Sequence, residues 1–421
     1  MRVLLLNTWE RSGGAARAAH RLHRALRTAV VDSRMLVLHR ESADAHVLPA
    51  PLDPHERRRD AIWSAIDDRW IRRNRTDRSD TWFSSGWPGR RLETHPWVTA
   101  ADVLHLHWIP GLLRSADVAA LLALGKPVVW TLHDEWAFTG GCHYSSGCER
   151  WRTRCGACPQ VRADPHGYVE SLFLDKRQDF AHGDLTVVTP SRWLAERARS
   201  SAILSGRPVQ VIPNSVEINR FTPALRDEGR RAIGCRPGEA IILFSATSLH
   251  ERRKGFAELR LALDSLAADP RMRARLAEGS LRLVTMGVPD ADPVAIPVTH
   301  RGVLSDDREI AAMMAAADVC AIPSLEDNLP NSALEAMACG TAVVAFATGG
   351  LPEAIGDHPA HATVPTGDVA ALAGALARSL ESEETAGRRN SIRSHAERRF
   401  SPAVQAAAHC GLYSGLLAST R

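Results

Sequence analysis

The chain has 421 residues, 45% of them hydrophobic and 24% charged, and its formal net charge is +4. This length and apolar content suffice for two or three globular domains, and the small, scattered net charge argues against a nucleic-acid-binding protein whose affinity comes from phosphate neutralisation. No apolar run reaches the roughly 20 residues that span a bilayer, Met1 leads directly into a core strand, and eight cysteines in so long a chain do not resemble a secreted disulfide framework, so we expect a cytoplasmic protein.

The N-terminal segment predicts a strand, a glycine loop and a helix. Residues 2–7, with the apolar run 3–6 at their centre, are expected to form the strand, and an amphipathic helix follows Gly13 and Gly14. Glycines at such a junction let backbone amides approach a phosphate or a sugar, although a Gly-Gly pair before a helix is most often only a turn. On the residues alone both interpretations stay open.

Residues 54–97 are rich in arginine and tryptophan. The spacing of Ile62, Ile66, Trp70 and Ile71 predicts an amphipathic face, which fits either a membrane surface or an internal helical hairpin. Acidic residues in the same segment dilute the positive charge that anionic lipid would require. We therefore favour packing and acceptor recognition, with at most peripheral membrane contact.

Histidines occur at two apolar strands of the first half. His105 and His107 alternate along one strand, which suits metal binding or packing, and packing is favoured because no acid or cysteine stands near them in sequence. His133 and Asp134 end a second strand at 128–132, and α/β sheets bind ligands at the carboxyl ends of their strands. His133 is therefore a candidate site residue, with simple capping of the strand end as the alternative.

Four cysteines follow with the spacing C-x5-C-x6-C-x2-C, namely Cys142, Cys148, Cys155 and Cys158. The terminal C-x2-C is a zinc-knuckle spacing, and thiolates in a reducing compartment select zinc over disulfides. The first interval is less typical of zinc. A structural zinc and free or redox-paired thiols therefore carry equal weight.

A second α/β unit is expected after a crossover segment. Residues 210–223 are interpreted as the linker and first strand of that domain, and 241–247 as its next strand. The basic triplet Arg252–Lys254 then precedes Gly255 at the start of a helix, where cations and amide dipoles can jointly hold a diphosphate. A solvated surface charge run is the alternative.

The stretch 318–355 predicts strand, loop, helix, strand, glycine turn and helix, which is the connectivity of a doubly wound parallel sheet. Asp327 lies on the loop, and Glu335 lies in the first turn of a helix that we expect to be capped by Asn331 or Ser332. Carboxylates there can accept hydrogen bonds from the hydroxyls of a neutral, polyhydroxylated ligand. Ser332-x-x-Glu335 also reads as a capping box, which helix signals alone favour by about two to one.

The run 323–353 resembles the donor-site signature of glycosyltransferase family 4, whose members are retaining enzymes of the GT-B fold. The family has a Glu-x7-Glu pair, and this chain has Asp327-x7-Glu335, with Asn328-Leu329-Pro330 in place of the family's Gly-Phe-Gly. The fold class that the resemblance implies is α/β: two Rossmann-like domains with parallel sheets that face a central cleft.

The resemblance also implies a domain organisation. Residues 1–207 would form an acceptor domain with a Cys-rich insert at 142–158, and residues 208–398 the nucleotide-sugar donor domain. Residues 399–421 would form a helix that packs back on the N-terminal domain. The segment 139–160 is similar to one found in a subgroup that includes exopolysaccharide transferases.

Family resemblance assigns candidate roles to individual residues. Lys254, assisted by Arg253, would stabilise the charge that develops on the departing diphosphate. Asp327 would hold sugar hydroxyls, Glu335 would hold the ribose or the donor, and His133 would position the sugar. The further donor-binding candidates are Gly13, Gly14, Asn328 and Leu329.

The function implied is a retaining, metal-independent hexosyltransferase. Its donor would be a UDP, GDP or dTDP sugar, and its acceptor a glycan lipid intermediate or a small natural product. One alternative is a GT-B epimerase acting on a nucleotide sugar, and the other is a non-catalytic scaffold that binds one. No nucleic-acid partner is expected.

Overall fold

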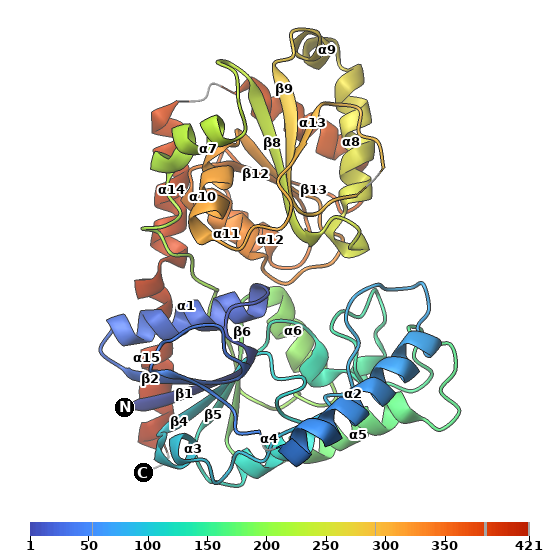
Figure 1. Cartoon of the computed structure of the whole chain (residues 1–421), viewed down its shortest axis with the longest axis vertical. Coiled ribbons are helices and arrows are strands. Elements are labelled where there is room, and N and C mark those ends of the chain that lie inside the picture. Colours follow the sequence, from blue (N-terminus) through green and yellow to red (C-terminus); the bar gives the residue numbers. More distant parts are fainter. Residues whose placement is uncertain (53, 291, 383–384, 420–421) are drawn as a thin grey trace. The chain divides into compact units, whose positions relative to one another are not determined.

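The computed structural model describes residues 1–52, 54–290, 292–382 and 385–419, which fold into two compact units (Figure 1). Unit 1 comprises Met1–Asn214 and Gln405–Arg421, and unit 2 comprises Ser215–Val404. Each unit is built on one parallel β-sheet. The prediction of an α/β protein with two Rossmann-like, parallel-sheet domains is confirmed.

Seven strands form the sheet of unit 1 in the order β3-β2-β1-β4-β5-β6-β7, and all neighbouring strands are parallel. They are β1 (Arg2–Trp9), β2 (Asp32–His39), β3 (Val47–Pro49), β4 (Val103–Leu106), β5 (Val128–Thr131), β6 (Leu185–Thr189) and β7 (Val209–Val211). The central strands are short apolar runs, because helices cover both faces of such a sheet. Strand order reverses between β1 and β4, so the carboxyl ends of these strands border the crevice where doubly wound sheets bind ligands.

The helices of unit 1 include one from the far end of the chain. They are α1 (Gly14–Thr28), α2 (Pro54–Asn74), α3 (Pro96–Ala100), α4 (Ser115–Leu122), α5 (Tyr168–Asp179), α6 (Arg192–Ser200), the 3-10 turns η1 (Trp136–Phe138) and η2 (Arg150–Arg152), and α15 (Pro402–Ser419). Leu412 and Tyr413 of α15 join the apolar cluster around Val3 and Leu5 of β1. Tyr413 Oη and His105 Nδ1 of β4 are 2.6 Å apart, so this helix is fixed to the sheet by a buried hydrogen bond.

The segment 210–223 does not supply a first strand to the second domain. Its strand, β7, pairs in parallel with β6 and therefore completes the sheet of unit 1. The chain leaves unit 1 at Asn214 and returns to it at Gln405, whereas the sequence interpretation placed these boundaries at 207 and 399. The sequence pattern marks a strand at this position but not the sheet that it joins.

Helix α2 packs less than the sequence interpretation expected. All of its 21 residues are described, and Asp60 alone is buried. Trp70, near its C-terminal end, packs against the core, but Ile62, Trp63 and Ile66 are exposed. Packing therefore accounts for one end of this helix and is the wrong explanation for its middle. In the described ranges no helix has the length and apolarity to cross a bilayer.

Six strands form the sheet of unit 2 in the order β10-β9-β8-β11-β12-β13. They are β8 (Ala240–Ser248), β9 (Leu281–Val288), β10 (Val298–His300), β11 (Val319–Ile322), β12 (Ala342–Phe346) and β13 (Ala362–Val364). The helices and turns are η3 (Pro223–Leu225), α7 (Arg226–Ala232), η4 (Arg252–Lys254), α8 (Phe256–Ala268), α9 (Pro270–Ala277), α10 (Asp307–Ala316), α11 (Asn331–Ala338), α12 (Leu351–Ile355), α13 (Val369–Glu381) and α14 (Ala386–Phe400).

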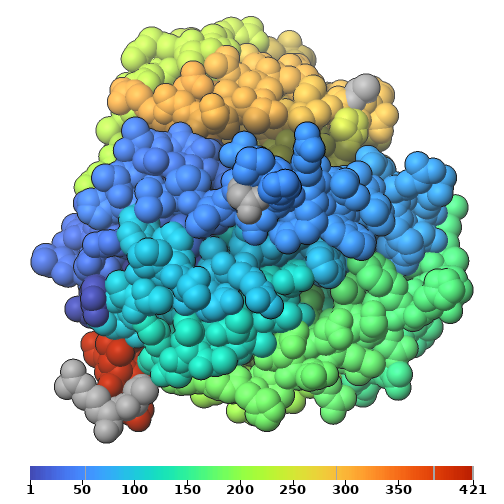
Figure 2. Space-filling view, turned by 60° about the horizontal axis from the view of Figure 1, so that its bottom comes forward, coloured from blue at the N-terminus to red at the C-terminus, as the bar shows by residue number. Residues whose placement is uncertain are grey.

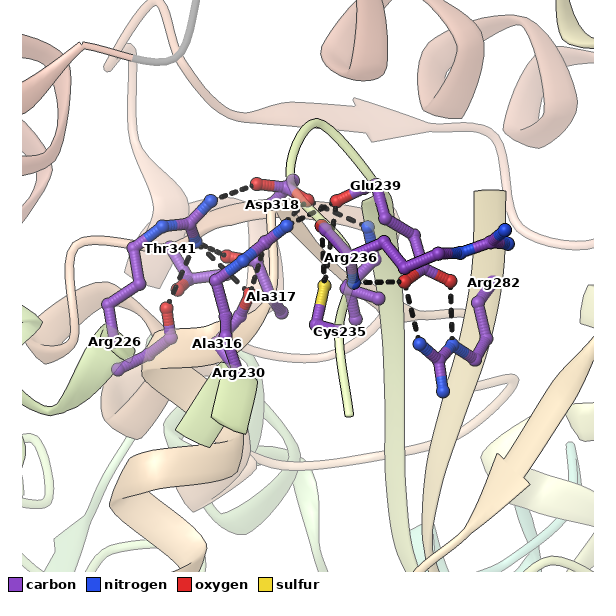
Figure 3. A network of polar contacts seen from close by, with 12 residues as sticks. Arg226, Arg230, Cys235, Arg236, Glu239, Arg282, Ala316, Ala317, Asp318 and Thr341 are labelled. Carbon is purple, nitrogen blue, oxygen red and sulfur yellow. Dashed lines mark hydrogen bonds and ion pairs between the residues drawn. The ribbon is translucent and has the colours of Figure 1, made fainter. Parts of the chain in front are cut away.

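A polar network holds the amino ends of the unit 2 strands together (Figure 3). Asp318, directly before β11, forms an ion pair with Arg226 of α7 and accepts a hydrogen bond of 2.7 Å from the backbone amide of Ile241 in β8. Glu239 forms an ion pair with Arg282 of β9 at 2.6 Å. These charges serve the structure at the amino edge, and the opposite, carboxyl edge of the sheet carries the candidate site.

Candidate functional site

The carboxyl edge of the unit 2 sheet brings together three of the predicted site residues. Arg253 and Lys254 lie on η4 after β8, and Asp327 lies on the loop after β11, the strand next to β8. Lys254 Nζ donates to Asp327 Oδ2 at 2.6 Å, and Arg253 Nη1 lies 3.4 Å from the same oxygen. Two cations therefore converge on one buried carboxylate where parallel sheets bind ligands.

Two glycines allow this loop to approach its neighbours closely. A Cβ atom added to Gly255 would lie 1.8 Å from the carbonyl oxygen of Pro323, and one added to Gly349 would lie 1.7 Å from that of Asp327. Both glycines also adopt positive φ angles, 73° and 58°. Any side chain at either position would displace the loop that carries Asp327.

Asp327 is held in its ionised form. The carboxyl group is buried, which by itself would raise its pKa, but the charges of Lys254 and Arg253 and a hydrogen bond from Lys254 hold the pKa below its usual value. The backbone amide of Asn328 also donates to Asp327 Oδ1, at 3.0 Å. A lysine ammonium has three donors, so Lys254 can be oriented by Asp327 and still bind an oxygen of a ligand.

The capping-box interpretation of Ser332 and Glu335 is wrong. Helix α11 begins at Asn331 with Pro330 as its N-cap, and no side chain caps it. Ser332 is thus the second helical residue, and Glu335 lies two positions further into the helix than a cap at Ser332 would place it. Its side chain is buried on the helix that directly follows the Asp327 loop, so a requirement of the helix start does not explain this glutamate.

The two residues after Asp327 serve the packing of the loop. Leu329 belongs to the apolar core of unit 2, and Asn328 is buried. The carbonyl oxygen of Asn328 accepts a hydrogen bond of 2.6 Å from the backbone amide of Gly350 at the start of α12. This hydrogen bond fixes the loop that carries Asp327 to the start of α12.

In unit 1, a small cavity lies at the carboxyl ends of β4 and β5, and His107, His133 and Asp134 contribute to its lining. His133 Nε2 and His107 Nδ1 are 3.1 Å apart. Desolvation lowers the pKa of His133 to about 4, despite the opposing charge of Asp134, so this ring is neutral at pH 7. Among the described residues, the buried Nε2 of His107 has no hydrogen-bond partner, which suits a ligand hydroxyl.

A hydrogen-bonded chain next to this cavity was not predicted. Asp134 Oδ2 and His143 Nδ1 are 2.6 Å apart, and His143 Nε2 and Ser84 Oγ are 2.8 Å apart. Trp108 Nε1 also donates to Asp134 Oδ2, at 2.9 Å. Position 143 is noticeable in the sequence only as the neighbour of a cysteine, and nothing singles out Ser84. These hydrogen bonds fix the carboxylate of Asp134 beside His133. They also join the Cys-rich segment to residues 82–85.

The glycine loop after β1 has the conformation of a turn. Gly13 is the N-cap of α1 with a φ of 91°, and a Cβ atom added there would meet nothing within 4 Å. The positive φ, and not a close approach, therefore requires this glycine. The backbone amides of Arg11 and Ser12 donate to Glu41 Oε1 at 3.4 and 3.1 Å, so amides of this loop already point at an anionic oxygen.

The four cysteines of the insert, Cys142, Cys148, Cys155 and Cys158, line one cavity. All are free thiols, and burial raises the pKa of Cys155 to about 12. Lys176 is buried within electrostatic range of Cys142 and Cys155, and its Nζ donates to the carbonyl oxygens of Trp136 and Thr139. In the described part of the chain, no three ligating side chains are spaced to hold a metal ion. The zinc site therefore stays a prediction, and the gathering of the four cysteines around one cavity is the observation that supports it.

We expect about one zinc ion per chain in protein purified under reducing conditions, as measured by elemental analysis. The double variant Cys155→Ser/Cys158→Ser should lose the metal, because it removes half of the ligands. The matched control Cys235→Ser/Cys410→Ser, which changes two cysteines outside the cavity, should retain it. Four reactive thiols without metal, or a mass lowered by disulfide formation, would contradict this prediction.

Two family models match the chain, one in each unit. The model "Glycosyltransferase Family 4" matches residues 12–220, and "Glycosyl transferases group 1" matches residues 239–382. Two Rossmann-like units with parallel sheets define the GT-B class. Both matched models describe glycosyltransferases, and together they cover most of the chain.

Individual proteins share parts of the sequence and the whole fold. A D-inositol 3-phosphate glycosyltransferase of Saccharomonospora viridis is 32% identical over 45% of this chain and 46% of its own length. The putative colanic acid biosynthesis glycosyl transferase WcaC of Escherichia coli is 26% identical over 59% of this chain and 60% of its own length. The alignments thus span about half of these relatives. The crystal structure of Anabaena HepE in complex with UDP and glucose is 15% identical, covers 98% of this chain and 99% of its own, and has a TM-score of 0.62.

Proposed function

We propose that this protein is a retaining glycosyltransferase that moves a sugar from a nucleoside diphosphate sugar to a hydroxyl of its acceptor. The observation that carries the proposal is the ion pair between Lys254 and Asp327 at the carboxyl edge of the unit 2 sheet. A buried ionised carboxylate with an oriented ammonium offers an acceptor for sugar hydroxyls and a cation for phosphate oxygens in one place. Neither the epimerase nor the scaffold alternative has a specific observation in its favour.

In this proposal Lys254 and Arg253 stabilise the negative charge that develops on the departing diphosphate. Glu335 accepts hydrogen bonds from the ribose or the sugar, and the neutral ring of His133 positions the transferred sugar. No side chain here is assigned the role of a covalent nucleophile. The acceptor attacks the face from which the diphosphate leaves, the diphosphate oxygen takes the acceptor's proton, and the anomeric configuration is retained. The residues assigned to the diphosphate are cations, so no catalytic metal ion is invoked.

The substrates are inferred from chemistry and from relatives. HepE was crystallised with UDP and glucose, which favours a uridine diphosphate hexose, with GDP and dTDP sugars as the other candidates. The relatives are named for D-inositol 3-phosphate and for colanic acid. Both names indicate polyhydroxylated acceptors, so we propose a glycan intermediate or a small polyol-type natural product.

A thermal-shift panel of UDP, GDP and dTDP and their sugars tests the donor. A bound nucleotide stabilises the fold by mass action, by about 2.7 kcal/mol at 100 times its dissociation constant, so one base should raise the melting temperature above the others. Mass spectrometry and NMR of the reaction with the donor so identified then follow the sugar. Transfer with retention supports the proposal. An isomerised donor would replace it with the epimerase, and binding without turnover on any polyol acceptor would replace it with the scaffold.

A further inference from the structure

Exposed apolar side chains gather at helix α2 and the loop after it. The large hydrophobic side chains exposed in the described part of the chain number twelve, and five of them lie between residues 62 and 87. Their exposed fractions are 60% for Ile62, 45% for Trp63, 51% for Ile66, 69% for Trp82 and 38% for Trp87. Folding of this chain leaves them in water. An apolar cluster of this kind marks a surface that meets something else.

Arginines flank the isoleucines on the same face of α2. Residues Arg58, Ile62, Ile66, Arg69 and Arg73 recur at every third or fourth position, which places them in one stripe along the helix. All five side chains are exposed. We call these five residues the basic stripe. The blue part of the chain that contains α2 lies at the surface of unit 1 in Figure 2.

The acidic residues of α2 do not neutralise the basic stripe. Asp60 is buried and forms an ion pair with Arg90. Asp67 accepts hydrogen bonds from Ser85 Oγ at 2.8 Å and from Tyr168 Oη at 3.2 Å. Both carboxylates therefore face the body of unit 1. The other two acids of α2, Glu56 and Asp68, are not members of the basic stripe, although Asp68 is exposed next to Arg69. Acids therefore dilute the positive charge of the outward face only in part.

We propose that α2 lies in the plane of a bilayer that contains anionic lipid, with the basic stripe against the lipid headgroups. Ile62 and Ile66 would enter the headgroup boundary, and Arg58, Arg69 and Arg73 would pair with lipid phosphates. The indoles of Trp63 and Trp87, whose ring centroids are 5.5 Å apart, have the amphipathic character that suits this depth. The helix does not span the membrane.

The charge pattern favours lipid over another protein as the occupant. A second copy of this chain that packed α2 against α2 would bring two rows of arginines together, and like charges across an interface oppose association. An anionic lipid surface complements every charge of the basic stripe at once. This inference does not rest on the proposed transfer activity, since binding to lipid requires no turnover.

Cosedimentation of the full chain with lipid vesicles tests the proposal. Vesicles of phosphatidylcholine with about 30% phosphatidylglycerol should bind at least about ten times more protein than pure phosphatidylcholine, because each arginine near an anionic surface contributes about 1 kcal/mol. Salt at about 1 M, where the Debye length is about 3 Å, should release most of that protein. Equal binding to both vesicles, or none to either, would overturn the proposal.

Two matched double variants locate the surface. Arg69→Gln/Arg73→Gln should weaken binding to the anionic vesicles about thirtyfold, which corresponds to two arginines at about 1 kcal/mol each. Arg57→Gln/Arg72→Gln removes the same charge from the same helix, but these positions are rotated by about 100° from the basic stripe, so binding should fall much less. An equal loss in both variants would show that net charge alone attracts the lipid and would overturn the proposal.

The apolar half of the surface is tested with Ile62→Ser/Ile66→Ser. This variant should reduce vesicle binding about tenfold or more and keep the melting temperature, because both side chains are already exposed. Light scattering after gel filtration distinguishes the other occupant. A dimer of the unchanged protein that this variant converts to monomers would assign the surface to a second copy and overturn the proposal.

Discussion

Replacing Lys254 with alanine is expected to lower the turnover number of sugar transfer by about two to three orders of magnitude. Lys254 Nζ lies 2.6 Å from the buried carboxylate of Asp327, which fixes the ammonium, and in the proposed mechanism this charge offsets the charge of the leaving diphosphate. Because that charge develops mainly in the transition state, kcat should fall more than the affinity for the donor. Release of the nucleoside diphosphate and its thermal-shift affinity measure the two quantities separately.

Arg252→Ala is the matched control, since Arg252 belongs to the same 3-10 turn but is exposed. It should retain activity within about a factor of three. Lys254→Met keeps the aliphatic stem and removes the charge, so it should be as inactive as the alanine variant without leaving a cavity. A Lys254→Met enzyme with more than about a tenth of the original kcat would contradict the role given to this lysine.

The contact between Lys254 and Asp327 could be predicted from the sequence, because the order of strands in the sheet is enough to bring the two residues together. Each residue follows an apolar strand, and parallel strands that are neighbours present their carboxyl ends at one edge. The strands themselves follow from periodicity: the two strands expected within 318–355 are Val319–Ile322 and Ala342–Phe346 in the structure. The sequence pattern of 318–355 therefore predicts both the strands themselves and the edge of the sheet at which Asp327 lies.

Helix α11 shows where local signals mislead. Ser332 and Glu335 have the spacing of a capping box, but Pro330 precedes the helix with a φ of −66° and the first helical residue is Asn331. Proline is preorganised for a helix start because its φ is fixed near this value. The N-cap lies two residues earlier than Ser332, which puts Ser332 inside the helix and removes the capping explanation for Glu335.

Contacts between loops could not be read from the sequence. Ser84, Asp134 and His143 form one hydrogen-bonded chain, yet the path of a loop leaves no periodic pattern in the residues. The amphipathic spacing of Ile62, Ile66 and Trp70 was visible, but a spacing does not say whether the body of the protein or another surface covers the apolar face. In the folded chain the two isoleucines are exposed, so the body of the protein does not cover this face.

Unit 1 is expected to lose stability steeply as the pH falls from about 6.5 towards about 4. His105, His107 and His409 are buried close together, with ring centroids of His105 and His107 4.3 Å apart and those of His105 and His409 5.4 Å apart. Burial, and secondarily the neighbouring histidines, lowers the pKa of His105 and His107 well below the ordinary value, and burial lowers that of His409 to about 4. The folded rings thus stay neutral where the same rings in the unfolded chain bind protons.

The sign follows from linkage: the unfolded state binds more protons in this window, so the free energy of unfolding rises with pH and falls on acidification. One pKa unit corresponds to about 1.4 kcal/mol. The lowered pKa of His409 alone therefore reduces the free energy of unfolding by up to about 3 kcal/mol when the pH reaches about 4. Thermal unfolding followed by circular dichroism between about pH 7.5 and about pH 4 measures the slope.

The variant His409→Phe isolates the contribution of this group, because it keeps a ring of similar size beside His105 and Tyr413 and cannot bind a proton. Among the described residues His409 Nε2 has no hydrogen-bond partner, so little is lost except the helix-internal bond from Nδ1 to the carbonyl oxygen of Gln405. The pH slope of this variant between about pH 6.5 and about pH 4 should be shallower by up to about one proton. His166→Gln, which changes an exposed histidine of the same unit, is the matched control. A slope equal to the original in both variants would mean that acid destabilises unit 1 through groups other than this cluster.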